Sequence, residues 1–136
     1  MDDRTMINDL FVRYTTALDA GDVETIVGCF TEDGALESPA VGVYAGRQGI
    51  REFAERFARF HERGAQLRHF ISNLAVQVNG NEAHATCYLL NVITRDGKTE
   101  LMPPGRYDCR LAKVDGQWLF AHRLVVLDGE VELTGI

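Results

Sequence analysis

The sequence has 136 residues, of which 46% are hydrophobic and 25% are charged. This length suits one domain with a buried core, so residues 1–136 are treated as a single domain. The net charge of −6 argues against nucleic acid or an anionic membrane as a partner, because both bind cationic surfaces.

Three stretches in the first half of the chain have helical periodicity. Apolar residues recur every three or four positions over residues 3–20, and Gly21 suits the left-handed end of a helix. Asp22 is a good N-cap for a short second helix over residues 23–30. A third helix is predicted over residues 47–60, with one apolar and one charged face.

The segment between the second and third helices contains turn-forming residues. We expect a turn over residues 31–34, which read Thr-Glu-Asp-Gly, and a short strand over residues 35–38 that Pro39 ends. Residues 41–46 are glycine-rich, and no regular element is predicted for them.

From Leu67 onward the apolar period changes to two, the period of a strand. Four strands are predicted, separated by Asn-Gly or Asp-Gly pairs typical of hairpin turns. They cover residues 67–79, 83–95, 105–114 and 117–127. Helices followed by an antiparallel meander predict an α+β fold, in which three N-terminal helices pack on a curved, mainly antiparallel sheet. We expect an apolar pocket at the open end of this cone.

His69 begins one of these strands, in an apolar run with Phe70 and Ile71. A histidine exchanges a proton near neutral pH, so His69 is either an acid or base at the edge of the interior or a core histidine satisfied by a hydrogen bond. Asp19 falls in the last turn of the first helix, at the negative end of the helix dipole. A cation or an imidazole opposite Asp19 would stabilise it there; the alternative is a surface residue in a bend.

Several short motifs occur in an order that is similar to one known family. They are Tyr14 with Leu18-Asp19-Ala-Gly-Asp22, Cys29-Phe-Thr-Glu-Asp33, Gly46, Arg68-His69-Phe70 with Asn73, Gly105-Arg-Tyr107, Asp115-Gly-Gln-Trp118 and His122-Arg123. This ordered set resembles the SnoaL-like branch of the NTF2-like superfamily. The resemblance implies a cone-shaped α+β fold with a deep apolar pocket, often dimeric through its sheet, so a homodimer is expected.

The resemblance also implies a catalytic pair. In this superfamily, scytalone dehydratase, the bile-acid dehydratase and the hexachlorocyclohexane dehydrochlorinase use an Asp from the first helix and a His from the first long strand. The corresponding residues here are Asp19 and His69. Tyr14 corresponds to the tyrosine before that Asp in the bile-acid dehydratase. Arg123 corresponds to the arginine on the last strand of that enzyme and of the dehydrochlorinase.

General chemistry suggests a role for each of these residues. Asp19 would orient His69, which would take a proton from a carbon next to a carbonyl group. Tyr14 would donate a hydrogen bond to the enolate oxygen or the departing hydroxyl, unless its ring only packs on the sheet. Arg123 would hold an anionic or carbonyl group of the substrate, or would simply form an ion pair, for example with Asp19.

Five aromatic residues are candidates for lining the pocket, although core packing is the alternative for most of them. They are Phe30, Phe53, Phe57, Tyr88 and Tyr107. Tyr88 is also expected near the position of the second pocket histidine of scytalone dehydratase. A two-histidine mechanism is therefore not expected, and Tyr88 would donate a proton instead.

No cofactor and no metal site are predicted. The histidines have no carboxylate or cysteine at metal-ligand spacing, and no glycine-rich phosphate loop is present. His61, His84 and His122 are expected on the surface or in the sheet. The three cysteines, an odd number at wide spacing, predict reduced thiols rather than a disulfide framework.

The sequence therefore predicts a cytoplasmic, cofactor-independent lyase (dehydratase) or isomerase that moves a proton on an apolar cyclic substrate of steroid, polyketide or terpenoid type. One alternative is a polyketide cyclase or ketosteroid-type isomerase in which Asp19 itself moves the proton. Another is a non-catalytic module that binds a small molecule. No membrane segment or signal peptide pattern is found.

Overall fold

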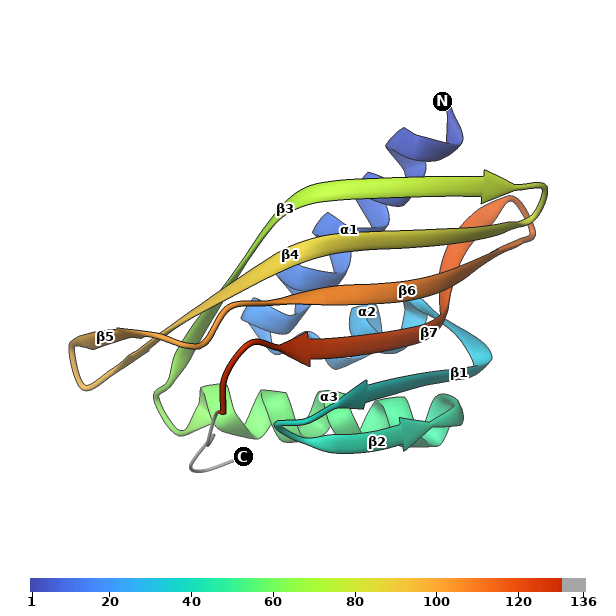
Figure 1. Ribbon diagram of the computed structural model, residues 1–136. Coiled ribbons are helices and arrows are strands. Elements are labelled where there is room, and N and C mark those ends of the chain that lie inside the picture. Colours follow the sequence, from blue (N-terminus) through green and yellow to red (C-terminus); the bar gives the residue numbers. More distant parts are fainter. Residues whose placement is uncertain (131–136) are drawn as a thin grey trace.

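Figure 1 shows the computed structural model, which describes residues 1–130. The first half of the chain supplies the helices α1 (Asp3–Ala20), α2 (Val23–Gly28) and α3 (Gly46–Glu62). The side chain of Asp2 caps α1, and that of Asp22 caps α2, because each accepts a hydrogen bond from a backbone N–H of the first turn. All three predicted helices are confirmed, with small differences at their ends.

The strands form one curved sheet. They are β1 (Phe30–Ser38), β2 (Gly42–Ala45), β3 (Gln66–Asn79), β4 (Glu82–Arg95), β5 (Lys98–Leu101), β6 (Gly105–Val114) and β7 (Gln117–Leu127). The strand order is β2-β1-β7-β6-β4-β3, with β5 paired to β4. Neighbours are antiparallel except β1 and β7, which are parallel. The predicted meander is confirmed as β3, β4, β6 and β7, and the fold is α+β.

The turn predicted over residues 31–34 is wrong, because these residues belong to β1. A register shift between Phe30 and Ala35, where β1 pairs with β7, accommodates the turn-forming residues inside the strand. Gly34 fits there because a Cβ at this position would lie 3.0 Å from the Phe120 carbonyl oxygen. The sequence also does not predict β2 and β5, which are four-residue strands at the sheet edge.

A bulge in β3 bends the sheet around the helices, and a close backbone approach requires glycine at the start of β6. A register shift interrupts the β3–β4 pairing between Ser72 and Ala75, and Asn73 in between has a φ of 56°. Such bulges bend a strand and increase its twist. At the start of β6, a Cβ on Gly105 would lie 2.1 Å from the Val126 carbonyl oxygen, so only glycine fits there. The bulge at Asn73 divides β3 into a first half, which contains His69, and a second half.

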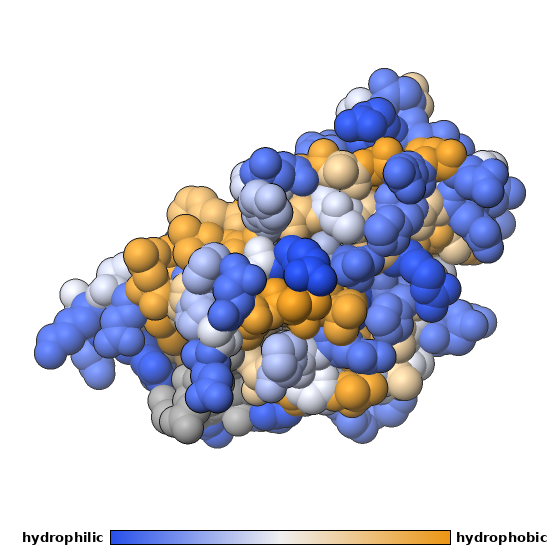
Figure 2. Space-filling view, viewed as in Figure 1, coloured by the Kyte–Doolittle hydropathy of each residue, from blue (hydrophilic) through white to orange (hydrophobic). Residues whose placement is uncertain are grey.

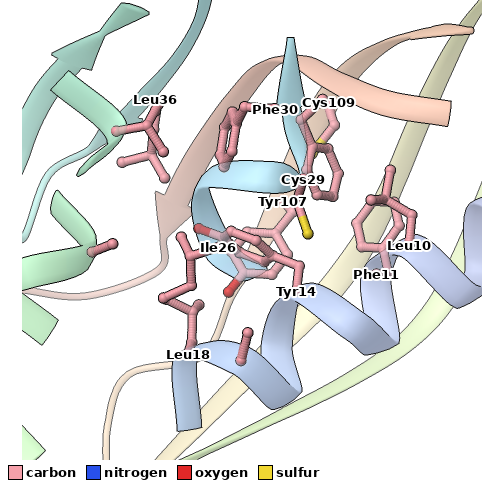
Figure 3. Packing of buried hydrophobic residues seen from close by; sticks show 14 of the residues in the cluster. Leu10, Phe11, Tyr14, Leu18, Ile26, Cys29, Phe30, Leu36, Tyr107 and Cys109 are labelled. Carbon is pink, nitrogen blue, oxygen red and sulfur yellow. The ribbon is translucent and has the colours of Figure 1, made fainter. Parts of the chain in front are cut away.

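The helices cover the concave face of the sheet, with α1 packed on β3 and α3 on β1 (Figure 1). The core between them is rich in aromatic rings, and Figure 3 shows several of its residues from close by. Phe11, Tyr14 and Phe30 each contact the ring of Phe120, with centroids 5.2 to 5.5 Å apart. Cys29, Cys87 and Cys109 are buried free thiols.

The outer face of the sheet carries both apolar and charged side chains. Figure 2 looks onto the sheet with the helices behind it and shows apolar and hydrophilic residues intermixed on this face. Among the apolar residues, Phe70 and Tyr88 are 57% and 60% exposed. Association of two copies through this face stays a prediction. None of the helices in residues 1–130 is long and apolar enough to cross a membrane.

Candidate active site

Asp19 lies in the last turn of α1. Three residues, Gly21, His61 and Gln66, hold the backbone of this turn in place. Gly21, with a φ of 68°, ends the helix. The Nε2 atom of His61, on α3, lies 2.8 Å from the carbonyl oxygen of Leu18. The side chain of Gln66, on β3, donates to the carbonyl oxygen of Asp19 at 2.8 Å. These contacts use carbonyl groups that have no partner within the helix, and they hold Asp19 against the start of β3.

The structure brings Asp19 and His69 into contact at two points. Oδ1 of Asp19 lies 2.5 Å from Nδ1 of His69, and Oδ2 accepts a hydrogen bond from the His69 backbone N–H at 3.1 Å. The His69 side chain is 3% exposed and the Asp19 side chain 13%. Because an ionised carboxylate can only accept, Nδ1 of His69 carries the hydrogen. Nε2 is then the ring nitrogen with a free lone pair.

His69 lines a cavity between the helices and the concave face of the sheet. Its volume is about 50 Å³, which is room for roughly three to five water molecules. The wall is mostly apolar and consists of Tyr14, Leu18, Leu36, Ser38, Ala40, Val41, Phe53, Phe57, His69, Leu89, Asn91, Met102, Pro103, Tyr107, Arg123, Val125 and Leu127. Asp19 is absent from this wall, so it reaches the cavity only through His69.

Arg123, on β7, is fully buried in this wall among aromatic rings. Its Cζ atom lies 4.0 Å from the ring centroid of Tyr14, 3.9 Å from that of Tyr107 and 4.5 Å from that of Phe120. Nη1 donates to the Sγ atom of Cys109 at 3.8 Å. No carboxylate among residues 1–130 forms an ion pair with Arg123, so the alternative of a pair with Asp19 is not realised.

The hydroxyl groups of Tyr14 and Tyr107 are hydrogen-bond donors that stay protonated. Burial raises the pKa of Tyr14 to about 12, although the nearby charge of Arg123 acts in the opposite direction. Burial also raises the pKa of Tyr107. Figure 3 labels both residues, Tyr14 from α1 and Tyr107 from β6, and the guanidinium of Arg123 lies close to both rings. Both phenols can therefore donate to a ligand near neutral pH.

Three of the five aromatic residues predicted for the pocket line the cavity: Phe53, Phe57 and Tyr107. Phe30 does not, because its ring packs in the core against Tyr14, with centroids 5.7 Å apart. Tyr88 does not either, and its placement in the pocket is wrong.

The alternation of β4 explains the position of Tyr88. Residues 83, 85, 87 and 89 of this strand are buried against the helices, whereas Tyr88 belongs to the opposite set and lies on the outer face. Tyr88 therefore cannot donate a proton inside the cavity.

Asn91 is a polar cavity residue that the sequence analysis missed, as is Ser38. Asn91 lies directly opposite His69 in the β3–β4 pairing. Its Oδ1 atom is buried and accepts no hydrogen bond from the described part of the chain. Counting in twos along β4 from the apolar Leu89 indicates that Asn91 faces inward, and this alternation is the signal that could have found it.

The remaining histidines lie away from the cavity. His84 contacts Asp108, and His122 contacts Glu37, in both cases on partly exposed side chains. His61 is half-buried and holds the end of α1 as described above. Within residues 1–130, no three His, Cys, Asp or Glu side chains are grouped so that they could hold a metal ion.

The family model of the SnoaL-like domain matches residues 1–124. The chain belongs to the SnoaL-like family. No curated protein matches this SnoaL-like chain significantly, whereas many solved structures do.

Three solved structures illustrate what this SnoaL-like domain is similar to. A protein of unknown function from Mycobacterium tuberculosis is 32% identical with a TM-score of 0.84, over 95% of this chain and 73% of that one. An NTF2-like protein with a cystatin-like fold from Novosphingobium aromaticivorans is 23% identical with a TM-score of 0.82, over 95% and 84%. A candidate scytalone dehydratase from the same organism is 22% identical with a TM-score of 0.82, over 96% and 89%. The last two establish a shared fold, and the predicted NTF2-like architecture is confirmed.

Proposed function

We propose that this SnoaL-like protein is a cofactor-independent lyase, most simply a dehydratase, or an isomerase that moves a proton on a cyclic substrate. The observation that carries the proposal is the 2.5 Å contact of Asp19 with a nearly buried His69 in the wall of a mostly apolar cavity. The shared fold with a candidate scytalone dehydratase supports the same class.

His69 is the proposed base. Asp19 engages Nδ1, so Nε2 takes a proton from a carbon next to a carbonyl group, and the electron pair of the broken C–H bond forms an enolate. Asp19 stabilises the imidazolium that results. Because Asp19 is not in the cavity wall, the geometry favours His69 over Asp19 as the group that touches the substrate. A cyclase or ketosteroid-type isomerase with Asp19 as the base is the less favoured alternative.

Tyr14 is the proposed donor to the enolate oxygen. Its pKa of about 12 keeps the phenol protonated, and a fixed donor in a site without bulk water stabilises developing negative charge strongly. The His69 imidazolium then returns its proton. Delivery to a different carbon gives an isomer, whereas delivery to a departing hydroxyl group releases water and leaves a carbon–carbon double bond. Either outcome balances without a cofactor.

The proposal is tested with two uncharged β-hydroxyketones, 3-hydroxycyclohexanone and 3-hydroxy-1-tetralone, whose dehydration products absorb in the ultraviolet. We expect the wild-type protein to accelerate dehydration and His69→Ala to lower kcat/KM by roughly 10²–10⁴-fold. His84→Ala removes an exposed imidazole that also contacts a carboxylate, so it is the matched control and should keep the wild-type rate. Equal rates for the wild type and His69→Ala would overturn the proposal, and binding of the ketones without turnover would indicate a non-catalytic module.

A further inference from the structure

The guanidinium of Arg123 is a buried charge with unused hydrogen-bond donors. Its Nη1 atom donates a long hydrogen bond to the thiol of Cys109, which is a weak acceptor. Nε and Nη2 are buried and have no hydrogen-bond partner within residues 1–130. The rings of Tyr14 and Tyr107 stabilise the positive charge through their faces. The ring faces do not satisfy the N–H groups of Nε and Nη2, so this edge of the guanidinium lacks an acceptor.

The two unsatisfied nitrogens lie on the same edge of the guanidinium. The N–H of Nε and one N–H of Nη2 point in parallel and match the two oxygens of a carboxylate. A carboxylate on this edge satisfies both donors and neutralises the buried charge. A single carbonyl or hydroxyl oxygen has to be shared by the two donors and leaves the charge in place. The free edge therefore selects an anion with two oxygens.

Asn91 adds an unmet group of the opposite kind in the same cavity wall. Its buried Oδ1 atom can only accept a hydrogen bond, and no donor reaches it from the described residues. A ligand hydroxyl satisfies this oxygen, whereas a carboxylate is repelled by it. Asn91 is the cross-strand neighbour of His69, so a hydroxyl group on Asn91 lies beside the proposed base.

We propose that the cavity binds a cyclic carboxylate that also carries a hydroxyl group. The carboxylate lies on Nε and Nη2 of Arg123, and the hydroxyl donates to Oδ1 of Asn91. The proposal rests on the proposed function in taking such a ligand, with a carbonyl group also in its ring, as the substrate. The hydroxyl beside His69 is then the group that the imidazolium protonates as it leaves. Arg123 and Asn91 become the residues that determine substrate specificity.

The size of the cavity sets the size of the ligand. A volume of about 50 Å³ favours a single ring over the steroid-sized substrates that the sequence suggested. The Arg123 nitrogens are covered in the structure, so side chains of the wall move when a ligand enters. Met102 is best suited to move, because it lines the cavity, is only partly buried and has a flexible unbranched side chain.

Binding of simple aromatic probes tests the proposal on the intact protein. Calorimetric titration at pH 7 compares benzoate with benzamide, which has the same shape without the charge, and with 2-, 3- and 4-hydroxybenzoate. We expect benzoate to bind roughly tenfold more tightly than benzamide. At least one hydroxybenzoate isomer should bind roughly fivefold more tightly than benzoate.

Three variants assign these preferences to residues. Arg123→Met should bind benzoate and benzamide equally, and Arg123→Lys, which keeps the charge but loses the paired donors, should weaken benzoate binding with an intact fold. Asn91→Leu should keep the affinity for benzoate and lose the gain from the hydroxyl group. Arg110→Met, at an exposed arginine outside the cavity, should change neither preference.

The carboxylate assignment is overturned if benzoate and benzamide bind equally to the wild type, if no probe binds up to about 10 mM, a weak limit for such ligands, or if Arg123→Met keeps the preference. Survival of the hydroxyl gain in Asn91→Leu overturns the assignment to Asn91. Catalysis is separable from binding. Benzoate preference in a protein that does not turn over the ketones refutes only the proposed function, and turnover without that preference refutes only the carboxylate site.

Discussion

The carboxylate of Asp19 contacts His69 twice, through Nδ1 at 2.5 Å and through the backbone N–H at 3.1 Å. One side chain therefore fixes both the ring and the backbone of the same residue. The chain contains a second pair of the same chemistry, His84 and Asp108, at 2.7 Å, but its side chains are 48% and 38% exposed. The two pairs differ in burial and in the ring nitrogen that meets the carboxylate, Nδ1 in His69 and Nε2 in His84. The second pair is an exposed control for the first.

Asp19→Asn should abolish the orientation of the base without removing it. The amide nitrogen of asparagine donates to Nδ1, which moves the ring hydrogen to Nε2 and removes the lone pair that takes the proton. We expect kcat/KM for ketone dehydration to fall by roughly 10³-fold or more, with little change in benzoate affinity. Asp108→Asn should stay within about twofold of the wild type. Similar losses in both variants would contradict the role of Asp19.

Arg123→Met should leave the protein at least as stable while it abolishes carboxylate binding. A buried charge without a carboxylate partner costs folding free energy, and an apolar side chain of similar length removes that cost. We expect the free energy of unfolding to be unchanged or to rise by about 1–4 kcal/mol, measured by urea denaturation. For comparison, Leu18→Ala in the same wall should lower it by about 2–5 kcal/mol. A loss in Arg123→Met as large as that in Leu18→Ala would show that Arg123 is primarily a structural residue.

Gly105→Ala should destabilise the sheet. The added Cβ would lie 2.1 Å from the carbonyl oxygen of Val126, so β6 and β7 have to separate at the rim of the cone. We expect a loss of about 1–3 kcal/mol in the free energy of unfolding. Gly28→Ala is the control, because a Cβ there meets no atom within 4 Å and alanine is the better helix former. An unchanged denaturation midpoint for Gly105→Ala would show that the rim is not closely packed.

Stability should fall at alkaline pH through Tyr14. Burial raises its pKa from 10.0 to about 12 in the folded protein. Below pH 10 the phenol is protonated in both folded and unfolded chains, so Tyr14 makes its full contribution to the free energy of unfolding. Between pH 10 and 12 the unfolded phenol ionises first, and the folded state loses about 2–3 kcal/mol. Urea denaturation at several pH values measures this loss, which should be smaller in Tyr14→Phe. Identical pH dependence in both proteins would contradict the burial of an un-ionised Tyr14.

Much of the fold follows from local patterns in the sequence. The helical periodicity of α1 and α3 is regular and continues over a long stretch of each helix. Asn79-Gly80 and Asp115-Gly116 mark two hairpins of the meander. The bulge in β1 was harder to predict from the sequence. Asp33-Gly34 has the composition of a turn, and only the pairing with β7 keeps it extended. The strands β2 and β5 are too short for a period to be recognised.

The site was predictable only in part. Periodicity alone does not bring Asp19 to His69, since their contact depends on how α1 packs on β3; the family resemblance supplied the pair. Asn91 was harder to place. Regular pairing from Asn79 with Glu82 would put Val92 opposite His69, but the extra residue at the Asn73 bulge shifts the register by one. Tyr88, in contrast, was assignable from the alternation of β4 alone.

The most direct test of His69 as the base is deuterium incorporation next to a carbonyl group in D₂O, followed by NMR. The probes are cyclohexanone and 3-oxocyclohexane-1-carboxylate, which exchange the same hydrogens and differ in the carboxylate. The wild type should accelerate exchange, His69→Ala should lose the acceleration by roughly 10²-fold or more, and His84→Ala should keep it. If His69→Ala exchanges either probe at the wild-type rate, His69 is not the base.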